Sequence, residues 1–327
     1  MKLRHLFIYI SVLVLSAGYG CSQKEKVKSV RFGICSDAHL PTMHDSEKRI
    51  TAFIDSMKTA KPDFIIELGD FAIPTKEYAP YFKIWNSFPG PKYHVIGNHE
   101  MDGGTTLDQA VAYRCMANSY YTFSEKGFKF IVLDGNDKEY EGQKGYRSYI
   151  GKKQLEWLRN ELTNAGQPIV IFSHQPIGPD SGIPGERYSV GNAKEIRQMF
   201  EEHNKTHKNS HIICCFNGHT HHDVAEEVNG IWYITINSMS YEWLGEEYEH
   251  IRYSKEVDKQ FKWIKYTAPY KDPLFSVVEI STDGRIHMSG KYSEFVGPSP
   301  WELGFPERLK KYVKPQITER DLTFSMN

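Results

Sequence analysis

An excess of either charge is missing from this 327-residue sequence: 40 Lys and Arg face 41 Asp and Glu, for a formal net charge of −1. Bulk electrostatic binding to a polyanion needs a basic surplus, so nucleic acid is not expected as a partner and any attraction for anions must be local. Low-complexity tracts and internal repeats are also missing. The length allows one sizeable buried core or two smaller ones.

Cysteine is scarce, with five in the whole chain. Four of them, Cys35, Cys115, Cys214 and Cys215, match neither a disulfide framework nor a C-x-x-C zinc site. We expect these four to be buried free thiols that act as small hydrophobic side chains. Because Cys214 and Cys215 are neighbours in a predicted strand, they should face opposite sides of it.

A long membrane-spanning run is missing too. The apolar run at residues 6–15 is too short to cross a bilayer, and it follows the basic residues Lys2 and Arg4. Small residues at positions 18 and 20 then precede Cys21, which is the arrangement of a secretory signal peptide. An uncleaved membrane anchor is the alternative interpretation.

A cysteine directly after the cleavage position resembles the lipidated cysteine of bacterial lipoproteins. The sequence therefore predicts a signal peptide over residues 1–21, lipid attachment at Cys21 and a polar tether over residues 22–29. The protein is expected to be exported to the periplasm or outer membrane and held at the membrane by that lipid.

Hydrophobic periodicity in the first part of the chain alternates between strand and helix. Residues 30–35, 64–68 and 93–96 are short apolar runs that predict buried strands, and residues 47–57 and 78–88 have the 3.6-residue period of helices. A β-α-β-α-β order of this kind predicts parallel strands with crossover helices.

Later in the chain the pattern becomes partly antiparallel. The predicted elements are a hairpin (120–123 with 128–133), helices at 154–162 and 193–200, a strand at 169–172, a meander (211–216, 224–228, 231–236) and a pair at 275–280 and 285–288. Together they predict an α/β fold with a mixed or two-sheet core. We expect a single catalytic domain over residues 30–290 and a C-terminal tail, residues 291–327, that packs on it.

Five short clusters of Asp, Asn and His each follow one of these apolar runs. They are Asp37-Ala38-His39, Gly69-Asp70, Gly97-Asn98-His99-Glu100, Ser173-His174 and Gly218-His219-Thr220-His221. Side chains placed where strands end point into the crevice at the carboxyl edge of a sheet, where open α/β sheets bind ligands. Donors from five strand ends at one edge predict a metal site.

The types of donor restrict the metal. Imidazole and oxygen ligands without thiolate suit Mn, Fe or Zn and argue against Cu(I) or an iron–sulfur cluster. A single His is more often structural than a ligand, so no role is assigned to the histidines outside the clusters. These are His44, His94, His203, His207, His211, His222, His250 and His287.

In this order, the five clusters resemble the D-x-H, G-D, G-N-H-[DE], H and G-H-x-H pattern of the calcineurin-like metallophosphoesterase superfamily, over residues 30–237. The resemblance implies two facing mixed β-sheets flanked by helices, a four-layer sandwich with a dinuclear centre at the strand ends. It implies that one metal is held by Asp37, His39 and His221, the other by Asn98, His174 and His219, with Asp70 as the bridge and His99 facing the substrate.

Two divalent ions, two aspartates and a bridging hydroxide would leave a local charge of roughly +1, enough to attract a phosphate to a neutral protein. Such a pair lowers the pKa of a shared water and clamps the attacking and leaving oxygens of an in-line displacement. The expected reaction is hydrolysis of a small phosphorylated substrate by hydroxide attack on phosphorus, with His99 as the general acid that protonates the leaving group.

The motifs leave the substrate open among monoesters, diesters and pyrophosphates. The alternatives are a cyclic-nucleotide or nucleotide-diphosphate diesterase and a non-catalytic, metal-containing binding lipoprotein. The second of these has no need of His99. A tyrosinate–iron centre like that of purple acid phosphatases is disfavoured because Ile73 stands where they have Tyr.

Two further segments bear on the substrate. Residues 178–191 form a Gly/Pro-rich loop that could border the pocket, and its Arg187 could contact a second phosphate, although a solvated loop Arg is the more common case. Residues 240–270 are dense in aromatics, which could stack a base or sugar but more often pack a cap onto a core.

Overall fold

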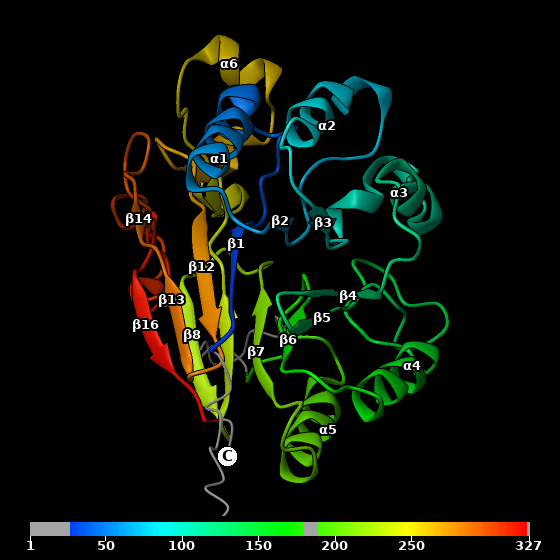
Figure 1. Cartoon of the computed structure of the whole chain (residues 1–327). Coiled ribbons are helices and arrows are strands. Elements are labelled where there is room, and N and C mark those ends of the chain that lie inside the picture. The colour runs from blue at the N-terminus through cyan, green and yellow to red at the C-terminus, as the bar shows by residue number, and fades with distance from the viewer. Residues whose placement is uncertain (1–26, 180–188, 326–327) are drawn as a thin grey trace, which may run out of the picture.

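A computed structural model describes residues 27–179 and 189–325 (Figure 1). The predicted signal peptide, Cys21 and Arg187 lie outside the described residues. Within the described part of the chain, no helix is both long and apolar enough to cross a membrane.

The first of two six-stranded sheets has the strand order β16-β13-β12-β1-β2-β3. Strands β1, β2 and β3 are parallel, which confirms the predicted β-α-β-α-β opening, and β12, β13 and β16 add antiparallel neighbours. The bounds are β1 Ser29–Cys35, β2 Phe64–Glu67, β3 Lys92–His94, β12 Ser276–Ser281, β13 Arg285–Met288 and β16 Arg320–Thr323.

The second sheet has the order β4-β5-β6-β7-β9-β8, with parallel pairing through β5, β6, β7 and β9. The predicted hairpin of β4 and β5 is confirmed. The bounds are β4 Tyr121–Glu125, β5 Phe128–Val132, β6 Ile169–Phe172, β7 Ile212–Asn217, β8 Val224–Val228 and β9 Ile231–Thr235.

The predicted meander is wrong in its strand order. Strand β7 pairs in parallel with β9, and β8 lies outside β9 at the sheet edge. The reason is burial: β9 is mostly buried, whereas Glu226 and Glu227 of β8 are exposed. Charged side chains on an edge strand also protect it from unwanted pairing.

The main core lies between the two sheets. Phe32 of β1 stacks on Phe64 at a centroid distance of 5.0 Å and meets Phe130, Phe172 and Phe216 of the second sheet edge-on at 5.7 to 6.1 Å. Aromatic pairs at these separations contribute packing beyond their buried area. The sheets therefore face each other directly across this cluster.

Helices cover the outer face of each sheet (Figure 1). Apolar side chains of α1 (Ser46–Ala60) and α2 (Ala79–Asn86) pack on the first sheet, and those of α4 (Lys152–Thr163) and α5 (Ala193–Thr206) pack on the second. All four helices were expected near these positions. The layers confirm the predicted four-layer α/β sandwich.

Smaller elements surround the sandwich. They are the helices α3 Leu107–Tyr113 and α6 Lys255–Gln260, the strand pairs β10 Tyr241–Trp243 with β11 Thr267–Pro269 and β14 Lys291–Tyr292 with β15 Gln316–Ile317, and 3₁₀ turns at Lys76–Tyr78, His99–Gly104, Glu246–Tyr248, Ile264–Tyr266, Trp301–Leu303 and Glu307–Leu309. Residues after 290 thus supply β16, an edge strand of the first sheet, as well as β14 and β15.

The four described cysteines are unpaired, and three are buried as expected. Cys214 packs in the core between the sheets and Cys215 beneath the helices, on opposite sides of β7. The prediction is wrong for Cys115, which is exposed. Cys115 lies in the turn that follows α3, outside the strands and helices that form the core, with a backbone φ of +55°.

Candidate metal centre

The five clusters meet at the carboxyl ends of strands from both sheets. Five of the nine described non-glycine residues with positive φ belong to them: Asp37, His39, Asp70, His219 and His221. A left-handed backbone at a residue other than glycine costs of order 1–3 kcal/mol and persists where the surroundings enforce it, most often at functional sites. The strand ends are therefore bent so that these side chains turn toward one point.

The first group of donors consists of Asp37, His39 and His221. Asp37 Oδ1 lies 3.2 Å from His221 Nε2, and the Nε2 atoms of His39 and His221 are 3.1 Å apart. Asp37 Oδ1 and His39 Nε2 are separated by 3.8 Å. These three ligand atoms share one small volume.

The second group consists of His174, Asn98 and His219. His174 Nε2 lies 3.2 Å from Asn98 Oδ1 and 3.2 Å from His219 Nδ1. His174 is fully buried, and its Nδ1 donates to the carbonyl oxygen of Leu68 at 2.8 Å. That hydrogen bond leaves the lone pair of Nε2 free to bind a cation.

Asp70 lies between the two groups. Its Oδ2 is 3.1 Å from His174 Nε2 and 3.8 Å from His39 Nε2, so a single carboxylate reaches both. Its Oδ1 accepts a hydrogen bond from the backbone N–H of His99 at 2.8 Å, which fixes the carboxylate plane. This is the position that a bridging ligand needs.

The donor set fits two cations. Asp37 Oδ1 is buried and has no hydrogen-bond partner among the described residues. The ring nitrogens of His39 and His221 lie 3.1 Å apart and those of His174 and His219 lie 3.2 Å apart, close to the roughly 3 Å that separates donors bound to one cation at about 2.0–2.1 Å. The spacing of the cluster thus suits a set of ligands for metal ions.

The charges of the site point the same way. Burial would raise the pKa values of Asp37 and Asp70, but His174 and other nearby histidines outweigh it and hold both carboxyl pKa values below their usual range. Burial lowers the pKa of His39 to about 3 and that of His219 to about 4, which leaves both imidazoles neutral. Burial lowers the pKa of His174, but the carboxylates of Asp70 and Asp37 outweigh it and raise that pKa to about 10. The centre therefore attracts positive charge, and a metal cation and a proton compete for the same position.

Glycines in the motifs allow this convergence. Gly69 has a φ of +98°, and a Cβ there would lie 2.7 Å from the backbone nitrogen of Gly97 and from His174 Nδ1. A Cβ on Gly97 would collide with the carboxylate and backbone of Asp70. Any larger residue at either position would push the bridging carboxylate away from the histidines.

A buried ionic network beneath the centre was missed by the sequence analysis. Glu100 accepts hydrogen bonds from the backbone N–H groups of Gly97 (2.6 Å), Phe71 (2.8 Å) and Asp70 (3.0 Å), and it pairs with Arg114 at 2.9 Å. Arg114 also lies 3.5 Å from Glu67, at the end of β2. A charged residue inside the apolar run 64–68 was the available signal for Glu67, whereas nothing in the sequence marks Arg114.

His99 lies beside the centre, and its ligand atom falls within one small volume with those of His39 and Asp70. Its Nε2 is 4.0 Å from Asp70 Oδ2, and its Nδ1 lies 2.7 Å from Asp102 Oδ2 and 3.0 Å from the hydroxyl of Tyr146. Tyr146 also donates to the other oxygen of Asp102 at 3.0 Å. Burial lowers the pKa of His99, but Asp70 and Asp102 outweigh it and raise the pKa to about 9.

Asp102 and Tyr146 therefore hold the His99 ring in place, and the sequence analysis missed both. Asp102 stands three residues after His99, a spacing that could have drawn attention to it. The structure brings together all seven predicted ligands and His99. Which metal each residue binds stays a prediction.

Comparison with known proteins agrees with a metal centre at this position. The family described as Calcineurin-like phosphoesterase matches residues 30–223, more than half of the chain. The manganese-dependent ADP-ribose/CDP-alcohol diphosphatase of Arabidopsis thaliana is 25% identical over 208 residues, which are 48% of this chain but only 64% of that protein.

Solved structures match over most of the chain. A dimetal phosphatase from Danio rerio superposes with a TM-score of 0.58 at 14% identity, covering 90% of this chain and 99% of its own. GAP50, the anchor in the inner membrane complex of Plasmodium, superposes with a TM-score of 0.51 at 16% identity, covering 91% and 90%. At these identities the likeness is one of fold. Since the family pattern spans every motif of the centre up to His221, the chain belongs to the calcineurin-like phosphoesterase family.

Proposed function

We propose that this protein hydrolyses phosphate esters of small molecules, using two divalent transition-metal ions drawn from Mn, Fe or Zn. The observation that carries the proposal is Asp70, whose carboxylate lies between two groups of imidazole and oxygen donors, with His99 adjacent. When bound, the two metal ions would supply an activated water and positive charge for the phosphoryl oxygens. Binding and proton transfer are left to the residues of the chain.

His99 is the general acid in this proposal. Its Nδ1 is engaged by Asp102, so Nε2 faces Asp70 and the pocket, where a leaving oxygen would receive its proton. Asp102 orients the ring and stabilises its protonated form, the task that a carboxylate performs for a catalytic His in other hydrolases. A binding lipoprotein without catalysis has no use for this arrangement.

Replacement of His99 by Ala should separate proton transfer from metal binding. We expect kcat on an alkyl phosphate to fall about 10²–10⁴-fold, the usual contribution of general acid catalysis, and kcat on 4-nitrophenyl phosphate to fall far less because that leaving group needs no proton. Metal content, measured by elemental analysis, should stay at the wild-type value.

His287→Ala is the matched control, since His287 is an exposed residue of β13 that pairs with Asp321. It should leave both rates unchanged. An unaltered rate of His99→Ala on the alkyl ester would refute the general-acid role.

A pyrophosphate substrate is the second candidate. The relative from Arabidopsis thaliana is by its name a diphosphatase of ADP-ribose and CDP-alcohols. The pocket above the centre, with a volume of about 780 Å³, has room for such molecules. A panel of phosphomonoesters, diesters, cyclic nucleotides and ADP-ribose, each with Mn, Fe, Zn or a chelator, separates the two candidates.

Export and lipid anchoring are also proposed. Cys21→Ala should move the protein from the membrane fraction to the soluble fraction of cells, because it removes the thiol to which a lipid would be attached. Cys115→Ala, at an exposed thiol far along the chain, is the control and should not change the distribution. A Cys21→Ala protein that stays with the membrane contradicts lipidation at this residue.

A further inference from the structure

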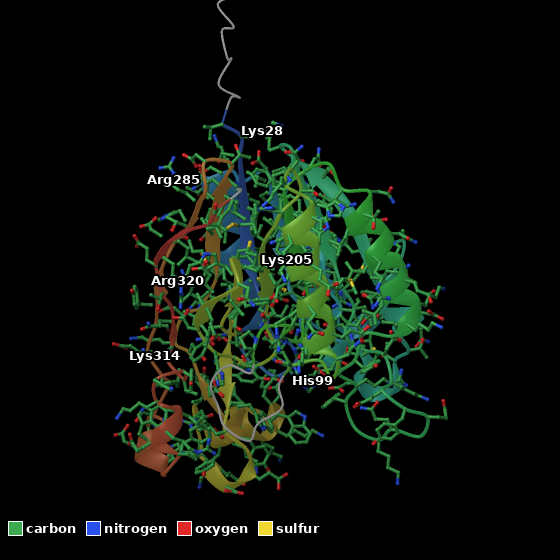
Figure 2. The ribbon with its side chains drawn as sticks, turned by 90° about the horizontal axis from the view of Figure 1, so that it is seen from below. Lys28, His99, Lys205, Arg285, Lys314 and Arg320 are labelled. Atoms are coloured by element: carbon green, nitrogen blue, oxygen red, sulfur yellow. The ribbon has the colours of Figure 1, made fainter. Side chains whose placement is uncertain are left out.

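The pocket extends well beyond the space that a phosphoryl group occupies. Its floor is formed by His39, Asp70 and His221 of the metal centre, and its volume of about 780 Å³ falls in the range of sites for complete small molecules. Trp243, Phe261 and Trp263, here called the aromatic wall, also line it. The segment that carries the wall lies at the same end of the molecule as His99 (Figure 2, yellow).

The two indoles of the wall are left open to solvent. Trp243 is 44% exposed and Trp263 is 47% exposed, and Tyr146 on another side of the same pocket is 55% exposed. Among the described residues, seven large hydrophobic side chains are exposed, and three of these seven line this one cavity. Apolar surface gathered around a concave site indicates a place where a ligand binds.

The wall is fixed in position relative to the metal centre. The ring centroid of Tyr266 lies 6.2 Å from that of Trp243 and 6.1 Å from that of Trp263, so one side chain packs against both indoles. Tyr241, two residues before Trp243 on β10, stacks on His39 at 5.0 Å, and its carbonyl accepts from His221 Nδ1 at 2.8 Å. By the rise of a β-strand, Trp243 lies about 7 Å from Tyr241 along β10.

A positive charge stands at the edge of the wall. The Nζ atom of Lys262 lies 4.8 Å from the ring centre of Trp263, and Lys262 forms no ion pair with residues 27–179 or 189–325. Its neighbour Lys265, in contrast, pairs with Glu249 at 2.8 Å. Lys262 is therefore available to an anionic group of a ligand, and an indole beside it supplies a planar apolar surface.

We propose that the aromatic wall stacks the planar base of a nucleotide and that Lys262 meets a phosphate other than the one held at the metals. The substrates would then be nucleotides with two or more phosphates, such as nucleoside diphosphates and their esters. This inference rests on the proposed function and names the substrate class of the same site. Base stacking on an aromatic side chain needs no specific hydrogen bonds, so the wall selects for a base without distinguishing one base from another.

The first test compares AMP with ribose 5-phosphate, which carries the same phosphomonoester without the base. In the wild type, AMP should have the higher kcat/KM. The Trp243→Ala/Trp263→Ala double variant should lower the ratio of the two values by about 5- to 150-fold, the range of stacking one base. Trp243→Phe/Trp263→Phe keeps two rings and should restore most of the ratio. Tyr292→Ala, at an exposed ring outside the pocket, is the control.

The second test concerns Lys262. Lys262→Gln should lower kcat/KM for ADP relative to AMP by about tenfold, since a charge-assisted hydrogen bond to phosphate is lost. Lys259→Gln, at an exposed lysine of α6 that does not line the pocket, should leave that ratio unchanged. An ADP/AMP ratio that Lys262→Gln does not alter overturns the assignment of the second phosphate.

A binding measurement separates this inference from the proposed function. Adenosine carries no phosphate, so its quenching of tryptophan emission reports the base site alone; it should occur in the wild type and be lost in the double alanine variant. Hydrolysis of AMP and ribose 5-phosphate with equal kcat/KM, without quenching by adenosine, overturns the base site and leaves the hydrolase standing. Quenching without turnover of any phosphate ester, whatever the metal, supports the base site and refutes the hydrolase.

Discussion

Asp70→Asn is expected to abolish turnover, by at least about 10³-fold, since removal of one group that stabilises transition-state charge already costs about 10²–10³-fold. Among the described carboxylates, Asp70 and Asp37 each lie within 4.0 Å of both His39 and His174, and Asp70 Oδ2 makes the closest of these contacts, 3.1 Å to His174. Loss of its negative charge weakens the hold on both cations together. Elemental analysis should therefore show less bound metal as well.

The substitution is mild for the fold. Asn tolerates the left-handed backbone that Asp70 adopts at φ +53°, and an amide oxygen can still accept from the His99 N–H. The melting temperature of the metal-free protein should stay close to that of metal-free wild type. Asp55→Asn, at an exposed carboxylate of α1, is the control and should retain full activity. Turnover that survives both Asp70→Asn and a chelator would show that this centre is not the active site.

Arg114→Met should lower the free energy of unfolding by about 3–5 kcal/mol, because it leaves buried carboxylates without their cation. The Arg114 side chain is fully buried, donates to Glu100 at 2.9 Å and lies 3.5 Å from Glu67. A loss of that size lowers the melting temperature by on the order of 10 °C. Since Glu100 holds the backbone of Gly97 and Asp70, metal affinity should fall with it.

A surface ion pair supplies the matched control. Arg159→Met removes a partner of Glu195 at 3.1 Å where both side chains are about half exposed, and such pairs contribute less than about 1 kcal/mol. Chemical denaturation monitored by circular dichroism measures both variants. Equal small effects from Arg114→Met and Arg159→Met would mean that the buried network does not support the centre.

The ends of the strands could be predicted from the sequence because buried apolar residues give way there to polar residues that can bind metals. Runs such as residues 169–172 are wholly apolar, and the residue types that follow them bind metals, so the meeting point of Asp37, Asp70 and His174 could be predicted. The four long helices were equally predictable from their periodicity. Both patterns are local, and local patterns determine these elements.

Features that depend on distant contacts could not be predicted. Strand β8 lies at the sheet edge because β9 is the more buried of the two. That outcome depends on which of the two strands pairs with β7, and neither strand's own sequence decides it. Arg114 gained its role from Glu67 and Glu100, which lie 47 and 14 residues away along the chain. The start of α3 was a missed local signal, since Thr106 and Gln109 form a capping box there.

In Figure 2, Lys28 lies at one end of the molecule and His99 lies in the opposite half. If Cys21 carries a lipid, the few residues between it and Lys28 connect the bilayer to the far end of the sandwich. The mouth of the cavity would then look outward into the aqueous compartment, so that dissolved nucleotides, and not phospholipid headgroups in the same leaflet, would be within reach.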